Sequence, residues 1–239
     1  MAALFNCRPE LIHFFSIFSF FLLFPVAFSD ELQTLLSIKS SLSNPTTNVF
    51  QNWEPSTPLC KFTGITCNSD GSVKEIELSN QKISGVVPFN KICSLTSLEK
   101  LSLGYNSFSG QVTDDLNKCV SLNYLDVGNN EFTGSFPDVS SLSELTHFYA
   151  NNSGFTGKFP WNSVANMRNL IVLSLGDNQF DRTPFPEVIL KLNKLNWLYL
   201  SSCRLEGEIP EEIGNLTELI NLELSMNYLT GEIPSGITN

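Results

Sequence analysis

The sequence has 239 residues, and its 14 basic and 24 acidic side chains leave a net charge of −10. This acidic balance, without a basic cluster, argues against nucleic acid or an anionic membrane surface as a partner, since both attract clustered lysine and arginine. Hydrophobic residues make up 42% of the chain, which is enough to bury one sizeable core.

The first 29 residues differ in character from the rest of the chain. The apolar run "LIHFFSIFSFFLLF" follows Arg8, and it is shorter than the ~20 residues that a membrane-spanning helix needs. Small residues at Ala27 and Ser29 are typical of a signal-peptidase site before Asp30. We therefore predict a cleaved signal peptide at 1–29, with a retained signal anchor as the alternative, no membrane span in the mature chain, and entry into the secretory pathway.

The mature chain is predicted to begin with a helix. In "DELQTLLSIKSSL", residues 30–42, the four leucines recur at spacings that bring them to one face of an α-helix. One apolar face is typical of a helix that packs against a larger core.

Five cysteines follow the signal peptide. Cys60 and Cys67 are separated by six residues, and in the oxidising secretory pathway this spacing predicts a local disulfide. We interpret the other three as small buried hydrophobic side chains: Cys93, Cys119 and Cys203. No second Cys or His lies at ligand spacing, so we expect no metal site.

From residue 71 to the end, the sequence repeats the pattern L-x-x-L-x-L-x-x-N-x-L-x-G with steps of 23 to 25 residues. Such a period predicts a leucine-rich-repeat solenoid. The paired leucines two residues apart predict a short strand with both side chains inward, and stacked strands form a parallel sheet. Seven units begin at Val73, Leu98, Leu122, Leu145, Leu170, Leu195 and Leu219.

One polar residue in each unit falls where the chain bends away from the strand. We predict that these side chains bond to backbone groups at the bend, because a buried unpaired group costs about 1–3 kcal/mol. Gln81 and Ser153 depart from the pattern and are expected to weaken this ladder locally. The predicted ladder residues are Gln81, Asn106, Asn130, Ser153, Asn178, Cys203 and Asn227.

The tails of the units, "SGVVP", "TGSFP", "TGKFP", "EGEIP" and "TGEIP", resemble those of plant-type leucine-rich repeats. The resemblance implies an α/β, right-handed solenoid with a concave parallel sheet and a second short strand in each turn. In the fifth unit Arg182 replaces the glycine and one residue is added, which predicts a broken second strand.

Residues 30–70, with the predicted helix, Trp53, Pro58 and the cysteine pair, resemble the amino-terminal cap of the same family. A cap is physically required, because the first turn of a solenoid otherwise exposes its core. The chain ends at "GEIPSGITN" without a comparable motif. We therefore predict a solenoid at 71–239 that has no carboxyl-terminal cap and is truncated.

The segments "NKICSLTSLEKLSLGYNSFSG" and "DLNKCVSLNYLDVGNN" resemble the amino-terminal part of HAIKU-type receptor-like kinases. This resemblance implies an extracellular segment that senses a secreted peptide, with a leucine-rich-repeat co-receptor kinase as a further partner. The membrane span and the kinase are expected outside these residues. Two alternatives stay open: a secreted binding protein, such as an inhibitor of pathogen cell-wall hydrolases, and a truncated product without independent activity.

Catalysis is not expected from this chain. The glycine-rich loop, catalytic aspartate loop and Asp-Phe-Gly of a kinase are all missing from the sequence. His147 is the only histidine of the mature chain and has no nucleophile motif beside it. We predict a binding protein without a cofactor.

Aromatic residues gather at the strand positions predicted to face the concave side. Tyrosine and tryptophan give large contact areas at low entropy cost and favour recognition sites. The alternative is that these rings only cover the sheet. The ligand-binding candidates are Tyr105, Tyr124, His147, Tyr149, Trp197 and Tyr199.

Two sequons predict N-linked glycans at Asn151 and Asn215. Asn215 falls on the convex return, where a glycan is harmless. Asn151 follows Tyr149 by two residues, so a glycan there would obstruct the aromatic surface.

Overall fold

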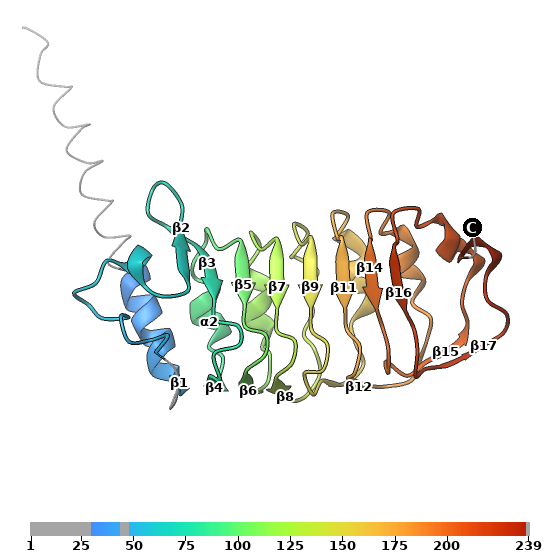
Figure 1. The fold of residues 1–239 in the computed structure, drawn as a ribbon, viewed down its shortest axis with the longest axis horizontal. Coiled ribbons are helices and arrows are strands. Elements are labelled where there is room, and N and C mark those ends of the chain that lie inside the picture. Colours follow the sequence, from blue (N-terminus) through green and yellow to red (C-terminus); the bar gives the residue numbers. More distant parts are fainter. Residues whose placement is uncertain (1–29, 44–47, 238–239) are drawn as a thin grey trace, which may run out of the picture.

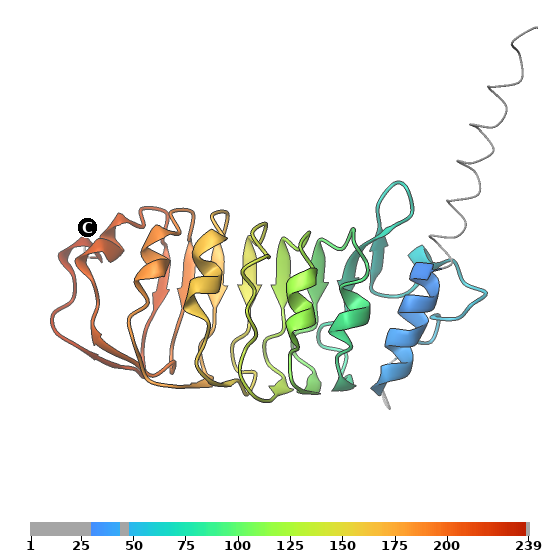
Figure 2. The ribbon, with the colours of Figure 1, turned by 180° about the vertical axis from the view of Figure 1, so that it is seen from behind.

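The computed structural model describes residues 30–43 and 48–237. The predicted signal peptide lies outside these residues. The described chain coils into an elongated stack of turns, with the helix of residues 30–41 at one end (Figure 1). The main strands line one side of the stack, and short helices line the opposite side (Figure 2).

The main sheet has eight strands in the described residues, and seven of them are parallel. In a central strand the middle residue, such as Leu125 or Leu173, is fully buried, and its two neighbours point to the opposite face of the sheet. The predicted parallel sheet is therefore confirmed. In spatial order the strands are β16 (Asn221–Glu223), β14 (Trp197–Tyr199), β11 (Val172–Ser174), β9 (His147–Tyr149), β7 (Tyr124–Asp126), β5 (Lys100–Ser102), β3 (Val73–Glu77) and the antiparallel β2 (Ile65–Cys67).

A second series of short strands runs along one edge of the stack (Figure 1). Within residues 30–43 and 48–237 it is divided into three separate sheets, with β1 antiparallel to β4 and the other pairs parallel. The sheets are β1 (Leu42–Ser43), β4 (Ser84–Val86), β6 (Ser107–Gly110) and β8 (Glu131–Phe132); β10 (Thr156–Gly157) and β12 (Gln179–Phe180); and β13 (Thr183–Pro184), β15 (Leu205–Glu208) and β17 (Tyr228–Thr230).

The fifth unit contains the predicted break. Strand β12 pairs backward with β10, whereas β13 pairs forward with β15. Asp181 and Arg182 connect the two strands, so the added residue lets one unit contribute to two sheets. A further division, between β8 and β10, was not predicted from the sequence.

Most of the short helices follow a proline, because its fixed φ suits the first turn of a helix. The exception is the 3-10 helix η2 (Asp114–Lys118), which follows Thr113. The elements are η1 (Leu59–Lys61), α2 (Phe89–Ile92), η2 (Asp114–Lys118), η3 (Trp161–Asn166), η4 (Glu187–Lys191), η5 (Glu211–Asn215) and η6 (Ser235–Ile237).

One apolar core runs through the described turns. Phenylalanines from successive turns stack within it, with ring centroids of Phe132 and Phe155 5.7 Å apart. Leu35 and Ile38 of the first helix are buried against the start of the core. The helix thus packs its apolar side against the first turn. Of the four leucines predicted for that side, Leu42 lies in β1 instead of the helix, and Ile38 is buried in addition.

The predicted disulfide between Cys60 and Cys67 is present. The interpretation of Cys93 and Cys119 as separate buried hydrophobic residues was wrong, because these two residues form a second disulfide. They are 26 residues apart and follow α2 and η2 in consecutive turns, which brings their Cα atoms to 4.6 Å. Cys203 is buried and free.

Candidate ligand-binding surface

The strands are held in place by side chains at the bends. The Nδ2 of Asn178 donates to the carbonyls of Ala150 and Leu175 at 2.8 and 2.9 Å, so it joins two successive turns. Its Oδ1 accepts the backbone N–H groups of Ser153 and Phe155. The same kind of bonding occurs at Asn106, Asn130 and Asn227.

The three other ladder positions make fewer bonds. The Ser153 hydroxyl donates to the carbonyl of Val127 at 2.8 Å, and the Cys203 thiol lies 3.4 Å from the carbonyl of Leu175. Gln81 donates only to Ser79 within its own turn. Ser153 and Cys203 therefore keep a bond to the preceding turn, which Gln81 in the first turn does not make.

We call the solvent-facing side of the main sheet the sheet face. It carries a first aromatic cluster, formed by Tyr124, His147 and Tyr149 on β7 and β9. The ring centroid of Tyr124 lies 5.6 Å from those of His147 and Tyr149. Lys100 adds a cation 5.0 Å from the Tyr124 ring, and its Nζ pairs with Glu77 at 2.8 Å.

Asp126 lies beside this cluster and is not among the sequence-predicted candidates. Gly104 makes room for it, because a Cβ at residue 104 would lie 2.4 Å from the Asp126 carboxylate. Burial raises the pKa of Asp126 to about 6; the Gly128 N–H and Lys100 oppose this rise, and Glu77 adds to it. Its position in the outward-facing column between Glu77 and Tyr149 was the sequence signal that could have identified it.

Burial favours the uncharged form of each ring in the first cluster. It raises the pKa of Tyr124 and Tyr149, with Asp126 as a further cause, and it lowers the pKa of His147. The first cluster is thus an aromatic surface with a carboxylate at its edge, suited to contact and hydrogen bonding.

A second aromatic cluster consists of Trp197 and Tyr199 on β14. The Tyr199 hydroxyl donates to Asp177 at 2.5 Å, and this bond, with burial, raises the pKa of Tyr199 to about 12. A Cβ at Gly176 would lie 2.2 Å from the Tyr199 ring, so glycine is required beneath it. The Trp197 side chain is 46% exposed.

The two clusters share the sheet face but are separated by β11. Its outward-facing residues, Val172 and Ser174, are small and buried. Ser174 pairs with Tyr149 on one side and Tyr199 on the other. Since strands lie about 4.8 Å apart, the strands that carry the two clusters, β9 and β14, are roughly 10 Å apart.

Tyr105 lies apart from both clusters. Its φ of 56° places it in the left-handed bend before Asn106, beyond the end of β5. The side chain is 64% exposed. The sequence pattern placed Tyr105 on the same surface because it follows the inward-facing Leu103 by only two residues, although the strand has already ended there.

The two sequons lie in different surroundings. The Asn151 Oδ1 accepts a hydrogen bond from Ser174 at 3.0 Å, which places Asn151 beside β11 and between the two clusters. Asn215 ends η5 and is exposed. Glycosylation at either position stays a prediction.

In the part of the chain that the structure describes, no helix is both long and apolar enough to cross a bilayer. The same residues contain no group of three or more His, Cys, Asp or Glu side chains placed to hold a metal ion.

Comparison with known families agrees with the turns and the first helix. Residues 28–68 match the leucine rich repeat N-terminal domain. Four segments match the Leucine Rich Repeat family: 97–119, 121–142, 194–216 and 218–239. The chain is a leucine-rich-repeat protein.

Its curated relatives include receptor-like kinases of Arabidopsis thaliana. The chain is 54% identical to Receptor-like protein kinase 7 over 209 residues, which are 86% of the chain and 21% of the relative. It is 43% identical to Receptor-like protein kinase HAIKU2 over 192 residues, 77% of the chain and 19% of the relative. The resemblance to HAIKU-type kinases is confirmed, and this leucine-rich-repeat chain spans about a fifth of each relative.

Solved structures of receptor ectodomains share the fold. The PEPR1–AtPEP1 structure matches with a TM-score of 0.76 and 33% identity, over 87% of the chain and 29% of that structure. The Arabidopsis receptor kinase HAESA, in complex with the peptide hormone IDA and the co-receptor SERK1, matches with a TM-score of 0.68 and 27% identity, over 87% and 39%. The plant-type solenoid is therefore confirmed.

Proposed function

We propose that the chain is the extracellular ligand-binding segment of a plant receptor-like kinase and that its sheet face binds a secreted peptide. The observation that carries the proposal is the pair of aromatic clusters on strands tied together by the asparagine ladder. Rigid aromatic side chains lose little entropy on binding, so they suit the centre of an interface. HAESA, a structural relative, is in complex with a peptide hormone.

An extended peptide that crosses β11 can contact both aromatic clusters. The roughly 10 Å between β9 and β14 corresponds to about three residues of extended chain. Such a peptide can place side chains against Tyr149 and Tyr199 and lay its backbone over Ser174. Asp126 and Asp177 stand beside the two clusters, so donor groups of the ligand can reach a carboxylate.

We further propose residues 30–70 as the amino-terminal cap and 71–239 as the solenoid, on the extracellular side of the plasma membrane. Signalling would come from a kinase in the rest of the receptor, and a leucine-rich-repeat co-receptor kinase would be the second partner. Homology to receptor-like kinases supports this reading over that of a secreted hydrolase inhibitor.

The proposal is tested by peptide capture. The glycosylated chain is immobilised and exposed to the peptide fraction of plant extracellular fluid, and bound peptides are quantified by mass spectrometry. We expect specific peptides to bind to the wild type and not to the triple variant Tyr124→Ala, Tyr149→Ala and Trp197→Ala.

The matched control is Tyr228→Ala, an exposed aromatic residue on β17 outside the sheet face. It should capture the same peptides as the wild type. Equal capture by the triple variant, or no peptide enriched on the wild type, would contradict the proposal.

A further inference from the structure

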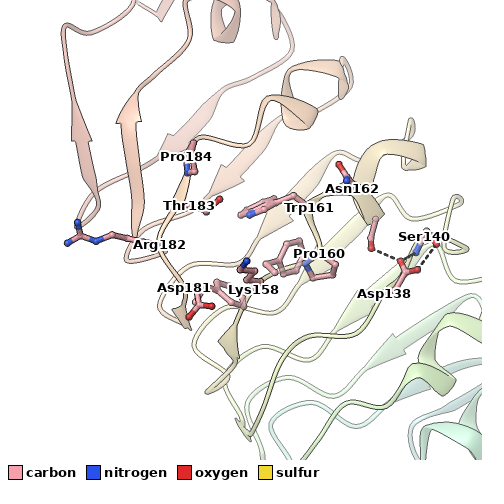
Figure 3. A pocket seen from close by; sticks show the side chains of 13 residues that line it. Asp138, Ser140, Lys158, Pro160, Trp161, Asn162, Asp181, Arg182, Thr183 and Pro184 are labelled. Carbon is pink, nitrogen blue, oxygen red and sulfur yellow. Dashed lines mark hydrogen bonds between the residues drawn. The ribbon is translucent and has the colours of Figure 1, made fainter.

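A groove follows the break in the second series of strands. Its first part, a cavity of about 800 Å³, lies between residues 158–163 of the fourth turn and 180–184 of the fifth (Figure 3). A second cavity of about 760 Å³ shares Trp161, Asn162, Thr183 and Pro184 with the first. The second cavity extends as far as Asn215. We call the two cavities together the flank groove.

Trp161 is the one large aromatic side chain that lines both cavities. It follows Pro160 at a position where neighbouring turns carry the acidic residues Asp138, Glu187 and Glu211. The ring packs at 4.7 Å from Phe159 but stays partly exposed. Its indole N–H has no hydrogen-bond partner among the described residues. The groove therefore offers a flat apolar surface with a donor at its edge.

Polar side chains without partners surround this ring. Within the described residues, Lys158, Asn162 and Asp181 make no side-chain hydrogen bond or ion pair, and all three are exposed. Arg182, by contrast, extends away from the cavity (Figure 3), toward Glu206 at 3.6 Å and the Tyr228 ring at 3.9 Å.

A sugar ring matches this combination of groups. The C–H face of a pyranose packs on an aromatic plane, while its hydroxyl groups exchange hydrogen bonds with amides, carboxylates and ammonium groups at the edge. The wall at Trp161 and the free groups of Asn162 and Asp181 supply both kinds of contact.

We propose that an N-linked glycan on Asn215 lies in the flank groove and packs its sugars against Trp161. Asn215 lines the groove, is exposed, and begins the sequon Asn215-Leu216-Thr217, so the occupant would be covalently held at the groove. The glycan covers the division between β12 and β13 and leaves the sheet face free for a ligand.

The test uses the full chain secreted from plant cells, with glycopeptide mass spectrometry to identify the modified sites. Release of the Asn215 glycan by an endoglycosidase is then timed under native conditions. We expect Trp161→Ala to speed release by roughly three- to tenfold, the range of one aromatic contact. Trp197→Ala, which removes a tryptophan from the opposite side of the stack, should leave the rate unchanged.

A second measurement leaves the groove wall intact. Asn215→Gln and Thr217→Ala each remove the sequon, and amide hydrogen exchange should rise in residues 158–163 and 181–187 of both variants. An unmodified Asn215 or equal release rates would overturn the proposal. If both sequon variants kept the wild-type protection of these residues from hydrogen exchange, something other than the glycan would cover the groove. That result would also overturn the proposal.

Discussion

Each ladder asparagine completes the backbone of two successive turns with one side chain. Asn178 makes five hydrogen bonds, three through Nδ2 and two through Oδ1. All its partners are backbone groups at a buried bend, so removing the Asn178 side chain leaves these groups without the bonds. The sheet face depends on this bonding, since the bends set the spacing between strands.

We expect Asn178→Ala to lower the free energy of unfolding by about 3 kcal/mol or more, since it leaves several buried backbone groups unpaired. Urea unfolding followed by circular dichroism measures the change. Asn90→Ala, at an exposed position of α2, is the control and should stay within ~0.5 kcal/mol of the wild type. Equal stabilities of the two variants would show that the ladder bonds do not stabilise the turns.

Asp126 makes stability depend on pH. Because its pKa is raised to about 6 in the folded chain, the folded state holds a proton that the unfolded state has released between about pH 4 and 6. Stability from this group therefore falls as the pH rises through that window. Asp126→Asn, which keeps an oxygen for the Gly128 N–H, should be more stable than the wild type at pH 7 by up to ~3 kcal/mol.

The difference should vanish below about pH 4 in thermal unfolding scans across the pH range. Asp138 provides a control of opposite sign, because hydrogen bonds from Ser163 and Ser140 lower its pKa. Asp138→Asn should therefore lose stability relative to the wild type as the pH rises. If Asp126→Asn were more stable than the wild type by the same amount at every pH, Asp126 would not have the raised pKa assigned to it.

The inward-facing residues and the ladder positions could be predicted from the sequence because both recur with the period of the turns. The place of Asp126 in the outward-facing column could be read from the sequence, but its burial could not, since it depends on the glycine at residue 104 in the neighbouring turn. The division of the aromatic surface was also hidden. It results from how deeply Val172 and Ser174 are buried between larger neighbours, which a list of outward-facing residues does not reveal.

The two disulfides differ in whether they join residues of one loop or of two consecutive turns. The Cys60–Cys67 bridge closes a loop inside the region before the main repeats, whereas Cys93–Cys119 ties two consecutive helices on the return side. The second pairing is not visible within a single unit, because Cys93 and Cys119 come together only when the helices of consecutive turns stack. The fifth-unit break was predictable, because an added residue cannot keep one strand in phase with both neighbours.

Removing Cys93–Cys119 should cost more than removing Cys60–Cys67. In the chain-entropy account, a loop of 26 residues contributes ~3–4 kcal/mol and a loop of seven ~2–3 kcal/mol. Paired alanine variants, compared by urea unfolding, measure both costs. A larger loss from the Cys60–Cys67 pair would show that the longer bridge does not act by restricting the unfolded chain.

As a whole, the molecule is a rigid stack whose two long sides have different chemistry. The sheet face carries the two aromatic clusters on strands that the asparagine ladder ties together. The side that carries the short helices also holds the flank groove. The fold of receptor ectodomains was predictable because each turn repeats one set of local rules. The position of a ligand was not, because it depends on which outward-facing side chains stand together across several turns.

The most direct test of the account is a calorimetric titration with a synthetic copy of a captured peptide. We predict that Tyr124→Ala, Tyr149→Ala and Trp197→Ala together weaken binding by roughly 100-fold or more, the loss typical of aromatic residues at the centre of an interface. Tyr228→Ala should bind like the wild type. An affinity of the triple variant within about twofold of the wild type would contradict the assignment of the sheet face as the ligand-binding surface.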